Sequence, residues 1–341
     1  MSKFLDVFHG KMSASPPLWF MRQAGRYLPE YREIREKQKT FLDLCYTPEL
    51  AAQITLQPIN RFDLDAAILF SDILVIPHGL GQPLSFEKGG GPQLDPLNLS
   101  SFEKELSFEK LLSKVSPVYE AIRLIRSQLS SSKALLGFSG APWTLALYML
   151  EGEGSRDFPK AKSQAFRHEE LFSSFLDFLS TAIAFHLIEQ VKAGASALQI
   201  FDSWTGCCPA SHFQKWIVKP TQKIISTVRE TYPQIPIVGF PKGAGVNLLE
   251  YGAQSGVSGL SLDSSTPLPW AVKNLPQDLI LQGNLDPLLL VAGGESLKRR
   301  IHSIHCEMKE RPYIFNLGHG IVPQTPIQNV EDCVNWVRAL R

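Results

Sequence analysis

The sequence has almost no excess of charge of either sign. Its 341 residues include 34 Lys and Arg against 33 Asp and Glu, so the formal net charge is +1 with neutral histidines. A general nucleic-acid-binding protein usually has a basic face, and this balance argues against one. An anionic ligand would have to be bound by a local cluster of basic side chains.

Cysteine pairs and long apolar runs are also missing. The five cysteines are an odd number without a CxxC pair, which predicts no disulfide framework and a cytoplasmic location. The densest uncharged apolar run, Phe178–Ile188, is far shorter than the roughly 18 residues that a membrane-spanning helix needs. The first residues contain no apolar run of the signal-peptide type. We therefore expect a soluble protein without a membrane partner.

Short apolar runs recur along the chain, each followed by a polar or glycine-containing turn and then by a helical pattern. Most runs lack polar alternation, which is typical of strands buried on both faces. Eight such strands alternating with helices predict a (β/α)8 TIM barrel of the α/β class, with a doubly wound open sheet as the alternative. The runs are Pro17–Met21, Ala66–Phe70, Ala134–Phe138, Ala197–Phe201, Ile235–Phe240, Ser258–Leu262, Asp278–Gln282 and Tyr313–Leu317.

Several helices between these runs have recognisable ends. Thr47-Pro48-Glu49 has the residues typical of a helix start, and Ser116-Pro117 predicts the start of a helix that reaches Leu129. A long amphipathic helix is predicted over Glu169–Lys192, closed by Gly194. A short helix is predicted over Thr266–Lys273.

In a TIM barrel the active site lies at the carboxyl ends of the strands, and polar residues follow most of the predicted strands. The glycine-rich segment Lys88–Pro92 lacks the GxxxxGK[ST] spacing of a phosphate-binding loop, so we interpret it as an active-site loop. The polar residues at the strand ends are Arg22, Arg26, Ser71, Asp72, Ser139, Tyr148, Asp202, Ser203, Lys242, Asp263, Asn284, Asn316 and His319.

Arg22 and Arg26 are four residues apart, so a helix would place both on one face. Their planar guanidinium groups are suited to binding carboxylates. The same spacing also fits two surface arginines that form salt bridges with Glu30 and Glu33. The spacing alone leaves both interpretations open.

Three other polar residues also have a functional and a structural interpretation. Asp72 directly follows an apolar run, where a carboxylate either caps the strand end or is kept for function. His319 lies between two glycines, which let the backbone approach a ligand closely, but it also fits an ordinary turn. Tyr148 lies in an apolar helical pattern, where packing in the core is the simpler explanation.

One group of residues has side chains that metals prefer. His302, His305 and Cys306 lie in the helical pattern between the last two strands, which is on the outside of the predicted barrel. We interpret them as a solvated helix face and predict no metal site. Cys207 and Cys208 are adjacent in the chain, so they make a poor chelating pair and a poor disulfide.

Several segments resemble the sequence motifs of the uroporphyrinogen decarboxylase family. The first, Pro17–Arg32, is long and specific, and the others follow in order over essentially the whole chain. One departure is Glu153, which stands where the family commonly has glycine. The other matching segments are Phe70–Leu74, Gly140–Leu145 with Tyr148-Met149, Phe201–Trp204, Gln282–Pro287 and Asn316–Gly320.

The resemblance implies a single-domain barrel over residues 1–341 that forms a homodimer and needs no cofactor. It implies removal of the four acetate carboxyl groups of uroporphyrinogen, giving coproporphyrinogen in tetrapyrrole and haem biosynthesis. It also implies that Asp72 faces the pyrrole N–H groups and stabilises a cationic intermediate. The positions that match substrate contacts are Arg22, Gln23, Ala24, Gly25, Arg26, Asp72, Tyr148, Ser203 and His319.

Two alternatives stay open. A related barrel methyltransferase would act on cobalamin-linked methyl groups and hold zinc with His and Cys near the barrel mouth, whereas the His–Cys group here is predicted on an outer helix. A non-catalytic tetrapyrrole-binding protein would not require a carboxylate beside the ring nitrogens, and Asp72 argues against it.

Overall fold

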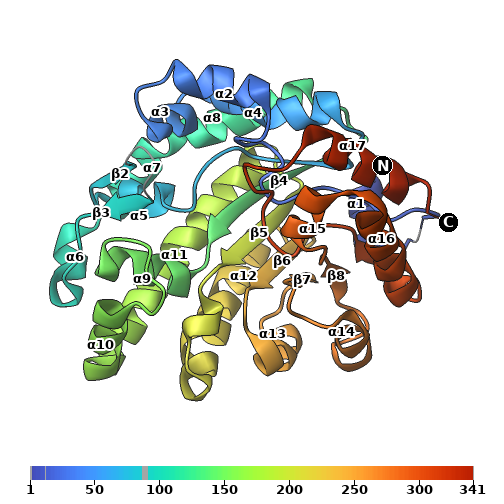
Figure 1. Ribbon diagram of the computed structural model, residues 1–341. Helices are drawn as coiled ribbons and strands as arrows, with labels where there is room; N and C mark the ends of the chain where they lie inside the picture. The colour runs from blue at the N-terminus through green and yellow to red at the C-terminus, as the bar shows by residue number, and fades with distance from the viewer. Residues whose placement is uncertain (1, 12, 87–90, 341) are drawn as a thin grey trace.

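Seven parallel strands form the centre of the molecule, with helices around them (Figure 1). The computed structural model describes residues 2–11, 13–86 and 91–340. The strands pair in the order β1-β4-β5-β6-β7-β8-β9, which is their order in the chain. Their bounds are β1 Ala66–Ile68, β4 Ala134–Gly140, β5 Ala197–Asp202, β6 Ile237–Pro241, β7 Gly259–Ser261, β8 Ile280–Gln282 and β9 Tyr313–Ile314.

The predicted first strand closes this sheet into a barrel. Leu18 forms a parallel bridge with Phe315, just beyond β9, and its carbonyl accepts a hydrogen bond of 2.9 Å from the N–H of Asp65, just before β1. The segment around Leu18 therefore occupies the eighth position between the two edge strands. The predicted TIM barrel is confirmed, and seven of its eight predicted strands are regular strands.

Burial explains why the apolar runs become strands. All seven residues of β4 and all five of β6 are buried, so neither face of these strands meets water. Parallel strands need this cover on both faces, and the crossover helices supply it. The helices are α1 Lys3–Asp6, α2 Pro29–Glu36, α3 Phe41–Tyr46, α4 Pro48–Arg61, α5 Val75–Leu80, α6 Phe102–Glu105, α7 Phe108–Lys114, α8 Ser116–Gln128, α9 Pro142–Glu151, α10 Pro159–Arg167, α11 Glu169–Ala193, α12 Lys219–Thr231, α13 Leu248–Gln254, α14 Leu268–Asn274, α15 Pro287–Ala292, α16 Gly294–Met308 and α17 Ile327–Arg338.

The predicted helix ends agree closely with the structure. Thr47 precedes α4, Gly194 ends α11, and α8 and α14 begin within two residues of their predicted starts. By length and composition α11 could cross a membrane, but it packs against α8, α9, α12 and β4. It is a core helix of the barrel wall.

A small hairpin follows α5 and was missed from the sequence. Strands β2 (Leu84–Phe86) and β3 (Pro92–Leu94) pair antiparallel. Of the predicted glycine loop Lys88–Pro92, residues 88–90 lie outside the described residues. Gln93 of β3 also bridges to Glu153, whose side chain is exposed. Glu153 thus lies beside this hairpin and does not line the central cavity described below.

One carboxylate joins three parts of the barrel seam. Asp65 Oδ2 accepts hydrogen bonds from the Leu18 N–H at 2.7 Å and from the guanidinium of Arg338 in α17 at 2.8 Å. Its side chain is only 13% exposed, so water cannot easily replace these partners.

We expect Asp65→Ala to lower the free energy of unfolding by about 2–3 kcal/mol, because the buried Leu18 N–H and the partly buried Arg338 lose a charged acceptor. The measurement is urea unfolding followed by circular dichroism. Asp63→Ala is the matched control, because Asp63 pairs with the same Arg338 but is 71% exposed. Asp63→Ala should lower the free energy of unfolding by less than about 1 kcal/mol. Equal losses in the two variants would contradict a seam that depends on Asp65.

Candidate active site

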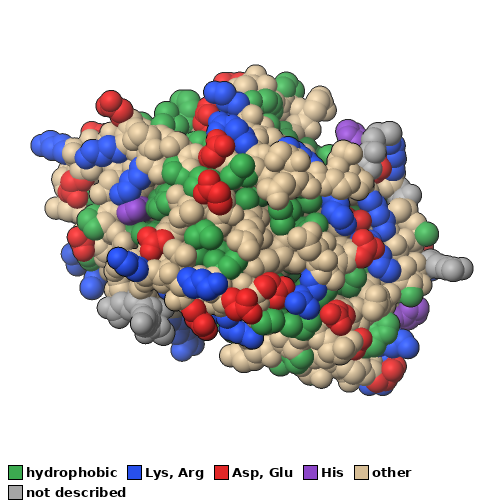
Figure 2. Space-filling model, turned by 90° about the horizontal axis from the view of Figure 1, so that it is seen from above, with side chains coloured by type: hydrophobic (Ala, Val, Ile, Leu, Met, Phe, Trp, Pro, Cys, Tyr) green, Lys and Arg blue, Asp and Glu red, His purple; other side chains and the backbone are tan. Residues whose placement is uncertain are grey.

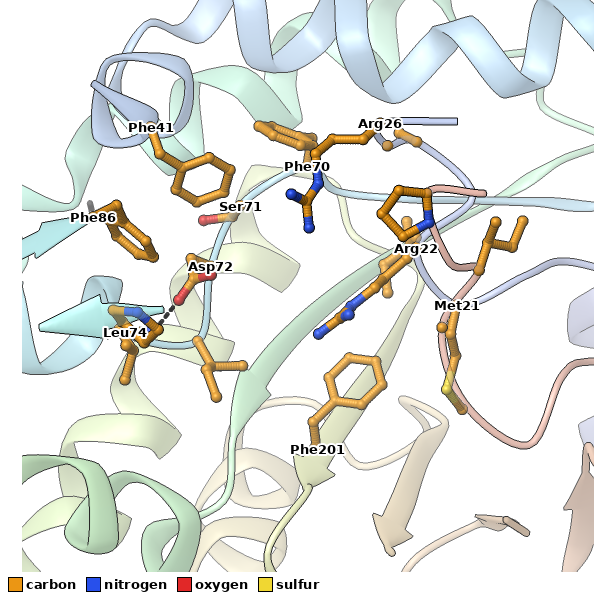
Figure 3. Close-up of a pocket in the computed structure, with 18 of the residues that line it drawn as sticks. Met21, Arg22, Arg26, Phe41, Phe70, Ser71, Asp72, Leu74, Phe86 and Phe201 are labelled. Atoms are coloured by element: carbon orange, nitrogen blue, oxygen red, sulfur yellow. Dashed lines mark hydrogen bonds between the residues drawn. The ribbon is translucent and has the colours of Figure 1, made fainter. Parts of the chain in front are cut away.

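A large cavity opens at the carboxyl ends of the strands, where the barrel fold places active sites (Figure 3). Its volume is about 1160 Å³, which is enough for a ligand larger than most drug-sized molecules. Of the nine predicted site residues, eight line it: Arg22, Ala24, Gly25, Arg26, Asp72, Tyr148, Ser203 and His319. The fold therefore brings together residues from five separate chain segments.

Gln23 is the exception, because its side chain is fully buried beneath the cavity. Its amide donates to the carbonyl of Ala66 at 3.1 Å and accepts from the N–H of Phe20 at 3.1 Å. The hydroxyl of Tyr27 donates to the Gln23 carbonyl at 2.7 Å. Gln23 thus ties the loop after the first barrel segment to β1, and its neighbours Arg22 and Ala24 face the cavity.

Arg22 does not lie on a helix, which corrects the prediction that a helix places it on one face with Arg26. It has φ 58° in a turn, and α2 begins only at Pro29. The side chain crosses Gly320, where a Cβ would lie 2.6 Å from Arg22 Cγ. The glycine therefore leaves the space through which Arg22 extends into the cavity (Figure 3).

The surface salt bridges that the spacing also allowed are not formed by either arginine with Glu30 or Glu33. Glu30 pairs instead with Arg61, at 2.9 and 3.1 Å. Within the described part of the chain, no acidic side chain forms an ion pair with Arg22 or Arg26. Both guanidinium groups are exposed to the cavity and free to bind a ligand.

Asp72 lies on the opposite side of the cavity from Arg22 (Figure 3). It follows β1, and its Oδ1 accepts a hydrogen bond of 2.8 Å from the N–H of Leu74. Burial raises the pKa of Asp72, while the Leu74 N–H and the positive charge of Arg22 favour the carboxylate. The hydrogen bond fixes one oxygen of Asp72 and leaves the other for a ligand.

His319 is a neutral hydrogen-bond donor at physiological pH. Burial, together with the charges of Lys242 and Arg22, lowers its pKa to about 4. Its Nδ1 accepts a hydrogen bond of 2.7 Å from the N–H of Gly320, so the ring proton is on Nε2. The ring lies 6.3 Å from that of Phe240, which places it over the apolar interior of the barrel.

Tyr148 and Ser203 complete the predicted set. Tyr148 comes from α9 and is partly buried against Phe158 and Trp204, with ring centroids 6.0 and 6.3 Å away. Burial raises its pKa, so the hydroxyl stays protonated. Ser203 directly follows β5 and lines the cavity. The neighbouring Asp202 instead points into the core, where the Thr144 hydroxyl donates to it at 2.5 Å and burial raises its pKa to about 6.

Sequence reasoning missed two features of the cavity. Its outer rim contains the cations Arg35, Lys37 and Lys39, which lie on α2 and directly after it. Its walls contain many phenylalanines, with Phe41 and Phe86 only 4.8 Å apart at their centroids. The run of basic residues after Tyr31 was a visible signal for the rim. The excess of cations is confined to the cavity and its rim. Over the face of the molecule in Figure 2, basic and acidic side chains are mixed.

The predicted outer His–Cys group lies on α16, away from the cavity. The Sγ of Cys306 and Nε2 of His302 are 3.5 Å apart, and His305 turns to the hydroxyl of Tyr313 at 2.9 Å. Among the described residues, no three His, Cys, Asp or Glu side chains meet as metal ligands.

Comparison with known proteins was consistent over the whole chain. The family model described as uroporphyrinogen decarboxylase (URO-D) matches residues 1–340. The chain is 48% identical to the uroporphyrinogen decarboxylase of Rhodospirillum rubrum over 99% of its length and 97% of the relative. It is 50% identical to that of a Chelativorans species, over 98% of each. A methyltransferase from Methanosarcina mazei has a similar fold, with a TM-score of 0.77 at 19% identity over 99% of this chain and 97% of that one.

The environment of His319 predicts its titration. We expect its imidazole to titrate with a pKa of about 4 and to carry the proton on Nε2 at pH 7, because burial and nearby cations disfavour the charged ring. The measurement is an NMR titration of the ring, with assignment from a His319→Asn variant. A pKa close to 6.5 would mean that the ring is solvated and would contradict this geometry.

Proposed function

The chain belongs to the uroporphyrinogen decarboxylase family, and on this premise we propose that it converts uroporphyrinogen to coproporphyrinogen by removing four acetate carboxyl groups. It is thus a carboxy-lyase of tetrapyrrole biosynthesis. The observation that best supports the proposal is the composition of the cavity. One fixed carboxylate, Asp72, faces a space lined by unpaired arginines and by phenylalanine rings.

The substrate matches this composition in charge and in shape. Uroporphyrinogen carries eight carboxylates around four apolar pyrrole rings. The phenylalanine walls suit the rings, and the cations suit the carboxylates. Cations outnumber acids among the lining residues: Arg22, Arg26, Arg35, Lys37, Lys39 and Lys242 against Glu36 and Asp72.

Asp72 supports the chemical step. Loss of CO₂ from an acetate arm leaves an electron pair that needs an acceptor. Protonation of a pyrrole ring carbon makes the ring a cation that accepts the pair. A second proton then converts the exocyclic CH₂ to CH₃, and loss of the first proton from the ring carbon restores the neutral pyrrole. The Asp72 carboxylate accepts hydrogen bonds from the pyrrole N–H groups and stabilises the ring cation. Because the substrate supplies its own electron sink, we propose that the reaction needs no cofactor.

The other site residues hold the substrate. Arg22 and Arg26 bind carboxylates through paired hydrogen bonds, and the turn residues Ala24 and Gly25 form the adjacent wall. Tyr148 offers a protonated hydroxyl and His319 a neutral Nε2–H. Ser203 offers a further hydroxyl. Gln23, whose side chain is buried, contributes by fixing the loop that carries both arginines.

We further propose a single domain over residues 1–341 that acts as a cytoplasmic homodimer, without nucleic-acid or membrane partners. These points rest on the family and on the near-neutral charge. The methyltransferase alternative is supported only by a similar fold at 19% identity. A tetrapyrrole carrier would not need Asp72 beside the ring nitrogens.

We expect the purified protein to remove four carboxyl groups from uroporphyrinogen under anaerobic conditions. Mass spectrometry of the oxidised products would show successive losses of 44 Da, the mass of one CO₂ each. Prior dialysis against a chelator should leave the rate unchanged, because no step needs a metal. Unchanged substrate, or activity lost on chelation and restored by zinc, would contradict the proposal.

We expect Asp72→Asn to lower turnover by about 10²–10³, because the amide keeps the shape but removes the charge that faces the ring cation. The comparison is kcat for CO₂ release, with circular dichroism to check the fold.

Asp286→Asn is the matched control for this change. Asp286 accepts a hydrogen bond from the N–H two residues later at 2.8 Å, as Asp72 does, but it does not line the cavity. Its variant should retain normal turnover. If Asp72→Asn behaved like this control, the carboxylate would have only a capping role.

A further inference from the structure

Lys242 is a cavity residue whose charge has no partner in the part of the chain that the structure describes. It directly follows β6 and is half buried. Among the described residues, no carboxylate or carbonyl accepts a hydrogen bond from its ammonium group. A partly buried charge without a partner is unfavourable. Binding of an anion therefore releases more free energy at such a charge than at one that is already paired.

The backbone of Lys242 is held in place from three sides. Its N–H donates to the carbonyl of Asp202 at 3.1 Å, and its carbonyl accepts from the N–H of Gly206 at 3.0 Å. The next N–H, of Gly243, donates to the carboxylate of Asp263 at 2.7 Å. Gly206 and Gly243 pack so closely that a Cβ on Gly206 would lie 3.1 Å from the Gly243 carbonyl. The base of the side chain is therefore fixed, as a binding group requires.

His319 faces the same part of the cavity. Phe240, two residues before Lys242, lies 6.3 Å from the His319 ring between centroids. Lys242 is also the charged group that most strongly lowers the pKa of His319, ahead of Arg22. With Nδ1 bonded to Gly320, His319 keeps its Nε2–H for a ligand in the cavity that Lys242 also lines. The two side chains thus offer two donors to one anion.

We propose that Lys242 and His319 together bind one substrate carboxylate on a ring other than the one that reacts. Strands β4 and β5 separate β6 from β1, so Lys242 lies well away from Asp72 along the sheet. Lys242 is then a specificity residue that fixes which acetate arm reaches Asp72. This inference rests on the proposed function.

Binding far from the reacting ring predicts a kinetic signature. Contacts of this kind are equally strong in the ground state and in the transition state, so their loss raises KM more than it lowers kcat. Partly decarboxylated products also have fewer carboxylates to hold them. Without Lys242 they should be released before they react again.

The test compares Lys242→Met, which removes the charge at similar length, with Lys242→Arg, which keeps it. We expect Lys242→Met to raise KM for uroporphyrinogen about 10-fold or more, in the range for one charge-assisted hydrogen bond, with a smaller effect on kcat. Products with five to seven carboxylates should accumulate. Lys242→Arg should restore most of both properties.

Lys273→Met is the matched control, because Lys273 is exposed on α14, outside the cavity, and should behave as the unchanged protein. If Lys242→Met fails to unfold cooperatively on heating, Lys242→Gln replaces it. An unchanged KM, or a fall in kcat alone, would overturn the role of Lys242. Inactivity of the unchanged protein would instead overturn the proposed function, so the two failures are distinct.

Discussion

Closure of the barrel by the segment around Leu18 determines where the binding groups lie. This segment bridges to Phe315 and bonds to Asp65, so it is fixed between the two edge strands. The buried Gln23 amide then ties the next turn to β1. Arg22 and Arg26 lie on this turn and can remain unpaired in the cavity because the backbone, rather than their own salt bridges, holds the turn in place.

Much of the barrel and most of the site could be predicted from the sequence. Buried parallel strands leave a strong local signal, because apolar residues occupy both faces, as in β4 and β6. Polar residues that follow such strands, including Asp72 and Ser203, then fall at one end of the barrel. The family resemblance added roles for these residues that their spacing alone could not supply.

The predictions that were wrong or missing concern segments whose conformation is set by tertiary contacts and not by the local sequence pattern. Arg22 and Arg26 have helical spacing, but the turn between them is set by Gln23 and by the space above Gly320. The Gln23 side chain points into the interior because it donates a hydrogen bond to the carbonyl of Ala66 in β1. This contact joins residues far apart in the sequence, so local sequence patterns do not predict it. Arg35 and Lys37 become rim residues only because α2 lies beside the cavity.

The contacts between the segment around Arg22 and the end of the chain affect how the protein folds during synthesis on the ribosome. The N–H of Met21 donates to the side chain of Asn316, a residue 295 positions later, and Arg22 passes over Gly320. The first barrel segment can thus pair early with β1 through Asp65, but it cannot acquire its second neighbour, around Phe315, until almost the whole chain has emerged. During this time its apolar residues Leu18, Trp19 and Phe20 lack part of their native cover, so the growing chain exposes apolar surface of the kind that chaperones bind.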